Sequence, residues 1–366
     1  MRSDELPLSR AVVDRAAHLR RDSVALTAAL AAPGTRVVLV HRGRVPVDEH
    51  GLVLATVADA TALGGSTDTQ VPGVAEGTPD VRSGLDDGSG RWLLLGADDE
   101  RVYLALRLGH EVDDEAVAAA LPRRGTQSDR LVHVPTPGPS GPVAAHGGVI
   151  GEGDGDAVVD GRARWASLRD AGARLAAHDA GLVTTAVALD AWHERHPRCP
   201  RCGAPTRATQ AGWVRTCTVD ASEHYPRTDP AVIMAVVDAD DRILLAHAVA
   251  WPAGRHSTLA GFVEPGESLE HAVRREVAEE TGVLVGDVTY AGSQPWPFPA
   301  SLMVAFVGRA LTTDVRVDGV EVEHARWFTR EALRDAIVAG EVVPPFASSI
   351  ARALIEDWYG GPLPTP

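Results

Sequence analysis

The spacing of hydrophobic residues divides the C-terminal half of the chain into strands and helices. Residues 231–237 are nearly all apolar, which is typical of a strand buried on both faces. Further short strands are predicted at 242–247, 288–291, 302–307 and 326–328. Helices are predicted at 331–339 and 348–359. Leu269, Val273 and Val277 recur at four-residue spacing, which predicts another helix with one apolar face.

The N-terminal half has a different pattern, in which short apolar or alternating runs are separated by turns rich in Gly and Asp. Strands are predicted there at 37–40, 51–56, 92–95 and 102–106. Residues 135–156 are dominated by Gly, Pro, Ala and Asp, and this composition predicts a flexible loop or linker. Residues 168–193 then show helical spacing and predict a helix that leads into the next module.

Length, charge and cysteine content narrow the class of protein. A chain of 366 residues is too long for one small core, and its net charge of −15 argues against a DNA partner. Residues 1–22 lack the apolar stretch of a signal peptide, and no apolar run is long enough to span a membrane. We therefore expect a soluble, cytoplasmic protein with no membrane partner. Its three cysteines, an odd number, favour a metal site over disulfides.

The helix predicted near residue 270 follows a tight loop. Gly261, Pro265 and Gly266 predict a turn. Ser268 can cap the start of the helix, and Gly282 can end it with a positive φ.

Three glutamates lie close together on this helix. Glu276 and Glu280 are four residues apart and therefore neighbours on its surface, and Glu279 lies beside them. Because like charges repel, this cluster predicts a cation among the carboxylates, and Mg²⁺ and Mn²⁺ prefer such oxygen ligands together with substrate phosphates. Arg275 and Glu267 are placed to pair with the acids and orient them. The alternative is a solvated acidic face of a helix.

Two positions outside the helix are candidates for the same metal site. The backbone carbonyl of Ala260 directly precedes the loop, and a carbonyl oxygen is a suitable ligand for a hard cation. Glu321 and Glu323 precede the last predicted strand, and either acid could complete the site.

A second metal site is predicted by the cysteines. Cys199 and Cys202 are two residues apart in a knuckle, and Cys217 follows at the distance expected for a second knuckle. The expected fourth cysteine is Asp220, whose carboxylate zinc accepts, and His224 is a second candidate. The alternative is a ribbon that no longer binds zinc and is held together by packing.

Residues 293–301 read Ser-Gln-Pro-Trp-Pro-Phe-Pro-Ala-Ser, with three prolines at alternate positions. These prolines exclude a helix and stiffen the segment, so that Trp296 and Phe298 keep fixed directions. A rigid aromatic loop near a metal-phosphate site is suited to recognition of a planar base or nicotinamide ring. A proline-rich surface loop with buried aromatic side chains is the alternative.

These motifs together resemble a known family. Residues 261–283 match the Nudix box at every specified position, and the order of zinc ribbon, Nudix box and aromatic-proline loop resembles the NADH pyrophosphatase, or NAD-capped RNA hydrolase, branch of the Nudix hydrolases. The resemblance covers roughly residues 168–359. It implies an α+β fold, with a Nudix α/β/α sandwich preceded by a zinc ribbon and an N-terminal α+β domain, and a homodimer. The expected segments are an N-terminal domain (1–134), a linker (135–167), a connecting helix (168–198), the zinc ribbon (199–226) and the Nudix domain (227–360).

The resemblance also implies roles for individual residues. The expected ligands of two or three Mg²⁺ or Mn²⁺ ions are Ala260, Glu276, Glu280 and Glu321, with Glu279 close by. Structural Zn²⁺ would be bound by Cys199, Cys202, Cys217 and Asp220, where the aspartate replaces the usual cysteine. The substrate-binding residues implied are Tyr225, Phe262, Gln294, Pro295, Trp296, Pro297, Phe298, Pro299, Ala300, Ser301 and Ala351.

The reaction implied is hydrolysis of the pyrophosphate bond of NADH or NAD to nicotinamide mononucleotide and AMP, with removal of NAD caps from RNA 5′ ends as an additional activity. The mechanism is expected to be metal-assisted attack of water, with Glu279 or Glu280 accepting the proton. Two other functions stay open at this point. One is a broader dinucleotide hydrolase acting on ADP-ribose or diadenosine compounds, and the other is a non-catalytic nucleotide- or RNA-binding regulator.

Overall fold

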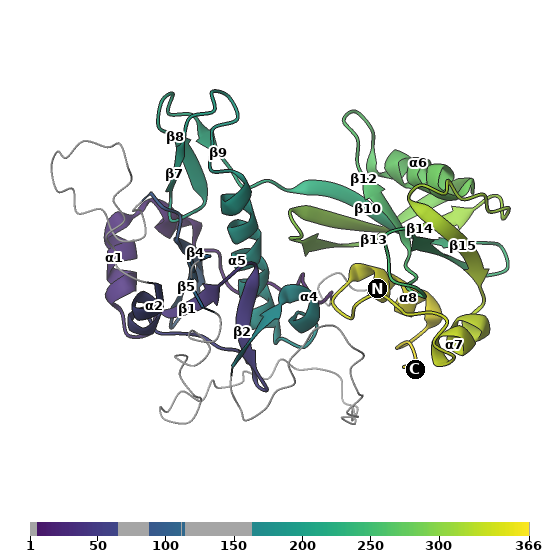
Figure 1. Cartoon of the computed structure of the whole chain (residues 1–366), viewed down its shortest axis with the longest axis horizontal. Coiled ribbons are helices and arrows are strands. Elements are labelled where there is room, and N and C mark those ends of the chain that lie inside the picture. The colour runs from purple at the N-terminus through teal and green to yellow at the C-terminus, as the bar shows by residue number, and fades with distance from the viewer. Residues whose placement is uncertain (1–5, 65–87, 111, 114–162, 366) are drawn as a thin grey trace.

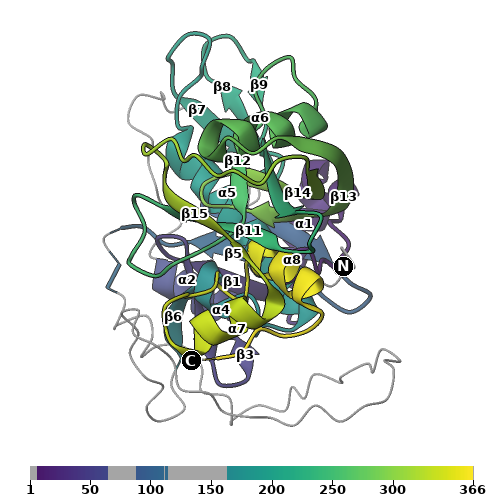
Figure 2. The ribbon, with the colours of Figure 1, turned by 90° about the vertical axis from the view of Figure 1, so that its right-hand side faces the viewer.

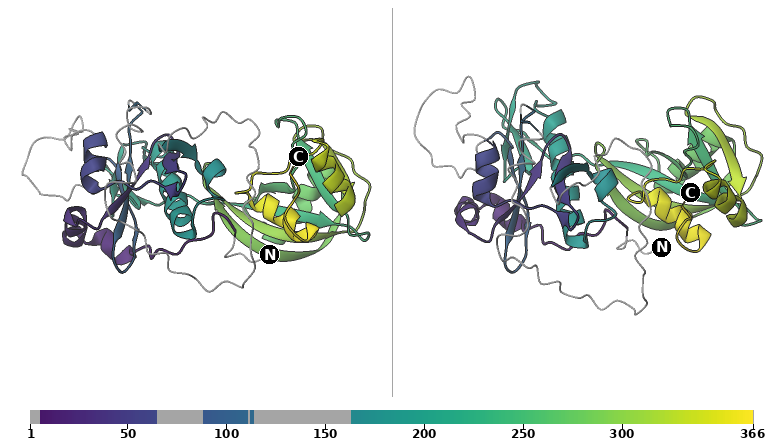
Figure 3. Two further views of the ribbon diagram at one scale, coloured as in Figure 1. Left: turned by 90° about the horizontal axis from the view of Figure 1, so that it is seen from below. Right: turned by 60° about the horizontal axis from the view of Figure 1, so that its bottom comes forward.

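The computed structural model describes residues 6–64, 88–110, 112–113 and 163–365. These residues form two lobes, which lie side by side in Figure 1 and are seen from below in Figure 3. Most of the predicted linker at 135–167 lies outside the described residues. Its last residues form a strand of the N-terminal lobe, β6 (Arg164–Ser167), which pairs with β2 (Arg44–Asp48).

The N-terminal lobe contains two three-stranded sheets and several helices. One sheet has the order β1-β5-β4, and its strands are β1 (Arg36–Val40), β5 (Val102–Arg107) and β4 (Trp92–Ala97). The other has the order β3-β2-β6, in which β3 spans Gly51–Leu52. The helices before residue 65 are η2 (Ala17–Arg21), α1 (Ser23–Ala31) and α2 (Val57–Gly64).

Three of the four strands predicted in this lobe are present at nearly the predicted bounds, and the other differs. The strand expected at 51–56 is reduced to β3, after which Ala55 forms an isolated bridge with Val37. The pattern also missed β2, which contains Pro46 although it is the central strand of its sheet. Proline is disfavoured in central strands because it cannot donate a ladder hydrogen bond, which is why the sequence did not indicate one.

The helix predicted at 168–193 is two helices in the structure, α4 (Leu168–Ala171) and α5 (Ala177–Arg195). Gly172 lies at the break, where a Cβ atom would come within 2.5 Å of Leu8 Cδ2 and 2.6 Å of the Leu168 carbonyl. The N-terminal segment therefore packs directly against the backbone at this point. None of the described helices combines the length and apolarity needed to cross a membrane.

The cysteine ribbon follows α5 and consists of short antiparallel strands. They are β7 (Thr206–Thr209), β8 (Val214–Cys217) and β9 (Glu223–His224). The ribbon lies at the top of the N-terminal lobe in Figure 1, beside the end of α5.

The C-terminal lobe is a mixed sheet between two layers of helices. Its strand order is β13-β14-β10-β11-β15, and β12 pairs with β10. The strands are β10 (Asp229–Val237), β11 (Ile243–Ala248), β12 (Leu259–Phe262), β13 (Val285–Trp296), β14 (Ser301–Ala310) and β15 (Val322–Phe328). The helices are α6 (Leu269–Thr281), α7 (Arg330–Val338) and α8 (Ile350–Tyr359). Figure 2 shows α6 on one side of the sheet and α7 and α8 on the other, as the predicted sandwich requires.

The strand β10 is buried on both faces, which confirms the prediction for residues 231–237. Val232, Met234 and Val236 belong to the core under α6, whereas the alternate residues Ile233 and Ala235 belong to the core under α7 and α8. Side chains alternate across a strand, so a run that is apolar at every position supplies two cores at once.

The two lobes meet at the aromatic-proline segment. Strand β13 continues through Trp296, so the first half of the predicted loop is strand, and only residues 297–300 connect it to β14. Trp296 and Phe298 pack against the core of the N-terminal lobe, while Leu6, from the start of the chain, packs in the core of the other lobe. This exchange of apolar side chains places residues 294–299 at the joint between the lobes.

Candidate active site

The helix α6 presents the predicted glutamates. The Ser268 hydroxyl accepts a hydrogen bond from the amide of His271, and Gly282 ends the helix at φ 70°, so both predicted caps are present. Val273 and Val277 are fully buried, and Glu280, one turn further on, is 7% exposed. Glu280 therefore lies within the buried stripe of the helix rather than beside it.

Arg275 holds three acids at the mouth of the site. Its guanidinium donates to Glu267 at 2.5 Å, to Glu276 at 2.9 Å and to Glu279 at 3.0 Å. It also donates to the carbonyl of Phe262 at 3.0 Å. These hydrogen bonds, and foremost the one that Arg275 donates to Glu267, hold the pKa of Arg275 above its ordinary value. Arg275, which was expected to pair with the acids and orient them, thus contacts Glu276 and Glu279, and Glu267 belongs to the same network.

Glu280 has no such partner. Burial first, and then the negative charges of Glu276 and Glu321, raise the pKa of Glu280 to about 8. Its Oε2 atom is buried and has no hydrogen-bond partner among the described residues. Burial, partly offset by Arg275, also raises the pKa of Glu276. A buried carboxylate that lacks a donor and faces other acids fits a divalent cation, which would replace the missing partner.

Gly261 allows the close approach of strand β12 to this helix. A Cβ atom at that position would lie 1.9 Å from the Glu276 carboxyl carbon. The glycine thereby leaves room for the Glu276 carboxylate beside the backbone of Ala260, whose carbonyl was predicted as a ligand.

A cavity of about 310 Å³ brings several predicted residues together. It is lined by Ala260, Glu280, Glu321, Trp296 and Ala351. These residues come from β12, α6, the turn before β15, β13 and the start of α8, which are separated by up to 91 positions in the sequence. Acids on one wall and an aromatic ring on another suit a ligand that joins a diphosphate to a planar ring.

Of the two acids left open before the last strand, Glu321 faces this cavity. The carboxylate of Asp318 accepts hydrogen bonds from the amides of Glu321 (3.1 Å) and Val322 (3.0 Å), and this turn presents Glu321. Glu323 instead lies 3.4 Å from His247. Asp318 belongs to no sequence motif, and its position before a Gly-containing turn is its only local signal.

Thr258 was also missed. It lines the cavity beside Glu280, and its buried hydroxyl has no hydrogen-bond partner among the described residues. Trp251 and Met303 line the same cavity and carried no motif in the sequence.

The residues of the aromatic-proline segment are divided between different environments. Trp296 faces the cavity with the glutamates, and its ring centroid is 4.9 Å from that of Phe298. Gln294 is completely buried, and its amide donates to the Ser348 carbonyl at 2.9 Å and accepts from the Leu8 amide at 3.3 Å. Gln294 therefore connects three segments and has no free polar group for a substrate. Residues Pro297, Phe298 and Pro299 line a different cavity, while Pro295, Ala300 and Ser301 line neither of the two.

Tyr225 and Phe262, implied as a ring-stacking pair, are not brought together. Their exposed fractions are 61% and 60%, and neither lines the cavity with the glutamates. The Tyr225 hydroxyl donates to Glu223. Their role in stacking a substrate ring stays a prediction.

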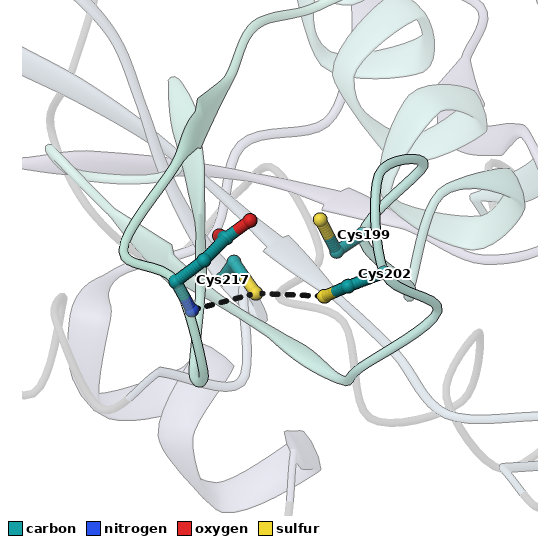
Figure 4. A group of neighbouring side chains, drawn as sticks. Cys199, Cys202 and Cys217 are labelled. Atoms are coloured by element: carbon teal, nitrogen blue, oxygen red, sulfur yellow. Dashed lines mark hydrogen bonds between the residues drawn. The ribbon is translucent and has the colours of Figure 1, made fainter.

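The predicted zinc ligands form a tight cluster in the ribbon. One ligand atom each from Cys199, Cys202, Cys217 and Asp220 lie within 4.8 Å of one another. Figure 4 shows the three cysteines on two facing segments. The sulfurs of Cys202 and Cys217 are 3.5 Å apart. Three sulfurs and a carboxylate oxygen at these separations fit a tetrahedral zinc ion.

Hydrogen bonds stabilise the ionised form of the Asp220 carboxylate. The side chain and the amide of Ser222 donate to its Oδ1 at 2.6 and 2.9 Å, and these hydrogen bonds lower the pKa of Asp220. His224, the other candidate ligand, lies 3.1 Å from the same Ser222 hydroxyl. Among the described residues, His224 is therefore not one of the four clustered residues, and it contacts Ser222 instead.

Comparison with known proteins places two domains in this chain. Residues 227–346 match the model of the NUDIX domain, and residues 194–225 match the NADH pyrophosphatase zinc ribbon domain. The curated relatives include the NAD-capped RNA hydrolase NUDT12 of Homo sapiens, 44% identical over 193 residues that cover 49% of this chain and 42% of the relative. They also include the NAD-capped RNA hydrolase NudC of Mycobacterium bovis, 46% identical over 187 residues that cover 48% of this chain and 59% of the relative. The chain spans about half the length of the curated relatives it matches.

Solved structures with a similar fold include a NUDIX hydrolase from Nitrosomonas europaea, with a TM-score of 0.36, 21% identity, and coverage of 45% of this chain and 94% of that chain. A MutT NUDIX hydrolase from Burkholderia pseudomallei has a TM-score of 0.27 and 25% identity, and covers 32% of this chain and 98% of that chain.

Proposed function

We propose that this chain, in which a Nudix domain follows an NADH pyrophosphatase zinc ribbon, hydrolyses the pyrophosphate bond of NAD(H) to nicotinamide mononucleotide and AMP. NAD caps on RNA 5′ ends carry the same bond and are the second substrate of the proposal, which the names of the relatives support. The observation that carries the proposal is the cavity lined by Glu280, whose Oε2 atom has no hydrogen-bond partner among the described residues, together with Glu321 and Trp296. It combines a place for a cation and a diphosphate with a place for a ring.

The ligands of the cation would be Glu276, Glu280, Glu321 and the carbonyl of Ala260. A divalent cation bound there would neutralise the pyrophosphate and lower the pKa of a water molecule. Arg275 keeps the carboxylates of Glu276 and Glu279 oriented before substrate arrives. Glu279, whose side chain is 61% exposed, and Glu280 are the candidates that accept the proton of the attacking water. Trp296 would place the dinucleotide by ring contact.

The test is product formation from NADH with added Mn²⁺, followed by chromatographic separation of the two mononucleotides. Turnover of NADH, NAD⁺ and ADP-ribose is compared under the same conditions, because only a pocket that recognises nicotinamide discriminates against ADP-ribose. Equal turnover of all three would favour a broader dinucleotide hydrolase. No product from any of them, with binding retained, would favour a non-catalytic nucleotide-binding protein and overturn the proposal.

The proposal includes the identity of the cations. The proposed ligand atoms at the catalytic cavity are all oxygens, which supports Mg²⁺ or Mn²⁺ there. Protein dialysed against a chelator should regain turnover on addition of either ion.

Zinc is proposed for the ribbon, held by Cys199, Cys202, Cys217 and Asp220. One zinc per chain is expected by elemental analysis of the purified protein. Asp220→Ala should lower this stoichiometry and His224→Ala should not. Wild-type protein without zinc would contradict the assignment.

We also propose that the protein is cytoplasmic and that it forms a homodimer, of which the resemblance implies the dimer. The exposed rings of Tyr225 and Phe262 support a dimer, since neither has a ring partner among the described residues. Light scattering after size exclusion measures the mass directly, and a monomer at micromolar concentration would contradict the dimer.

A further inference from the structure

A second cavity, of about 670 Å³, lies where the two lobes meet. Its N-terminal walls are the turn between β1 and β2 with Arg42, helix α4 with Arg169, and the last turn of α5 with Arg195. Its other wall consists of residues Pro297–Pro299 and Phe346 from the Nudix lobe. The volume is within the range of about 300–1,000 Å³ that is typical of small-molecule sites.

Three of the four arginines that line this cavity, Arg42, Arg169 and Arg195, form no ion pair with a carboxylate among the described residues. The guanidinium groups of Arg169 and Arg195 have no hydrogen bond or ion pair among the residues that the structure describes. The guanidinium of Arg42 donates to a carbonyl, that of His110, at 2.8 Å. In a chain with a net charge of −15, three arginines without an acidic partner around one cavity indicate an anionic ligand.

Two of the three acids that line the cavity are already paired with other cations. Asp190 forms an ion pair with Arg107 at 2.6 Å, and Glu194 lies 3.3 Å from Arg107 and 3.2 Å from His110. The third, Asp170, accepts the hydroxyl hydrogen bond of Ser167 at the start of α4. Asp190 and Glu194 are thus paired with Arg107, whereas Asp170 keeps its charge, and none of the three acids forms an ion pair with Arg42, Arg169 or Arg195 among the described residues.

The wall toward the Nudix lobe is shared with the catalytic cavity. Along β13 and its turn, Trp296 lines the catalytic cavity and the next three residues line the second one. Phe346, in the segment before α8, lines the second cavity. Ser349, at the end of the same segment, and Ala351, in the first turn of α8, line the catalytic one. A ligand in the second cavity would therefore contact the same two segments that shape the catalytic cavity.

One arginine of the cavity lies over an aromatic side chain of this wall. The Cζ atom of Arg169 is 4.4 Å from the centroid of Phe298, and both residues line the cavity. A guanidinium group beside an aromatic ring suits a nucleotide, since a nucleobase stacks on such groups and the N–H groups can donate to phosphate oxygens.

We infer that the interlobe cavity is a second nucleotide site, which binds phosphate groups through Arg42, Arg169 and Arg195. Two sources supply this chemistry. One is the RNA body of a capped substrate, whose cap occupies the catalytic cavity and whose next phosphates cross the shared wall. The other is a free nucleotide that acts on the catalytic cavity through that wall. The first source rests on the proposed function, whereas the site itself does not.

The binding test uses ATP in the presence of a chelator, so that no divalent cation is bound and the catalytic acids repel the probe. The variant is R42Q/R195Q, because both side chains are exposed and neither belongs to the proposed catalytic machinery. The matched control is Arg309→Gln, an exposed arginine on β14 that lines neither cavity. Calorimetric titration should show ATP binding about tenfold weaker in the double variant, since two charge-assisted contacts are lost, and unchanged in the control. Equal affinity in all three proteins, or no binding of ATP to any of them, overturns the site.

Kinetics then distinguish the two sources. If the RNA body is the ligand, the double variant raises KM for NAD-capped RNA several-fold and leaves both kcat and KM for NADH unchanged. If a free nucleotide is the ligand, ATP changes the NADH turnover of the wild type and has no effect on that of the double variant. Because the ATP titration needs no catalysis, an inactive protein that binds ATP through Arg42 and Arg195 would overturn the proposed function and retain the site. If the protein is active but the double variant matches the wild type in both the ATP titration and the kinetics, the site is overturned and the proposed function is retained.

Discussion

The two metal sites proposed for this chain differ in their ligand atoms and in whether they leave space for a substrate. In the ribbon, three sulfurs and one carboxylate lie within 4.8 Å of one another and form a closed set of four ligands. In the Nudix lobe, carboxylates from a helix and a turn face a cavity of about 310 Å³ that leaves space for a substrate. Closed sets of thiolate ligands are typical of structural zinc, whereas oxygen ligands with open positions are typical of catalytic Mg²⁺ or Mn²⁺.

The pKa values of one carboxyl group from each site, Asp220 in the ribbon and Glu280 in the Nudix lobe, differ in the same way. Hydrogen bonds from Ser222 lower the pKa of Asp220, so the ribbon holds its carboxylate as an anion without a metal. Burial raises the pKa of Glu280 to about 8, so the carboxyl group of this residue is mostly protonated at neutral pH in the metal-free protein. The ribbon site is therefore organised before a metal binds, whereas the proposed catalytic site would be completed by its ligand.

The largest effect is expected from Glu280→Gln. Turnover of NADH should fall by about 10³-fold, because the amide cannot replace a charged ligand for the cation. At pH 9 the thermal midpoint of the metal-free protein should rise, because the variant removes a buried negative charge without a partner. The matched control is Glu323→Gln, which lies outside the cavity and should retain wild-type turnover. Wild-type turnover in Glu280→Gln would remove this residue from the site.

A smaller loss is expected from Gly261→Ala. The added Cβ atom would meet the Glu276 carboxyl carbon at 1.9 Å, so the carboxylate must move. Misplacement of a ligand by about 1 Å can cost roughly 10²-fold in turnover. Gly361→Ala, where a Cβ atom meets nothing within 4 Å, is the control. Steady-state kinetics with NADH measure both, and equal kcat values would show that Glu276 need not lie beside Gly261.

The affinity of the proposed catalytic site for Mn²⁺ should depend on pH. Cation binding must displace the proton of Glu280, so affinity for Mn²⁺ should rise by up to about tenfold per pH unit below pH 8 and level off above it. Titration calorimetry at pH 6, 7 and 8 measures this slope, which Glu280→Gln should flatten. A slope that persists in the variant would assign the proton to another group.

Stability of the metal-free protein should change with pH in opposite directions at the two carboxylates. The folded pKa of Glu280 is raised above its ordinary value of 4.5, so its contribution to stability is lost as pH rises from 4.5 through about 8. The folded pKa of Asp220 is lowered below 3.8, so its contribution is present above that pH and is lost as pH falls further. Urea unfolding across pH 3–9, with Glu280→Gln and Asp220→Asn as the paired variants, measures each window.

The smallest effect on turnover is expected from the ribbon. Cys202→Ser should abolish zinc binding and lower the thermal midpoint by several degrees, because structural zinc contributes folding free energy. Turnover of NADH at 25 °C should stay within about threefold of the wild type, since no ribbon residue lines the catalytic cavity. A loss of activity as large as that of Glu280→Gln would contradict the division into a structural and a catalytic site.

Local signals predicted much of the fold because they act over a few residues. Ser268 and Gly282 cap α6 as expected, and the apolar run of β10 is buried on both faces. The spacing of the cysteines also predicted that Asp220 would lie with them, and the four residues form one cluster. In contrast, the length of β13 was underestimated, because it depends on pairing with β14 across the sheet rather than on its own residues.

The sequence by itself determined the chemistry of this protein, since it specified which acids, thiols and rings are available and at what spacing. Only the tertiary structure decided how deeply Glu280 is buried, that Glu321 rather than Glu323 faces the cavity, and that Gln294 is used to connect segments. It also decided the existence of the interlobe cavity, whose walls come from residues 42 to 346. Caps and periodicity are interactions between near neighbours in the chain, whereas burial, cavities and unpaired charges depend on segments that meet only when the two lobes pack together.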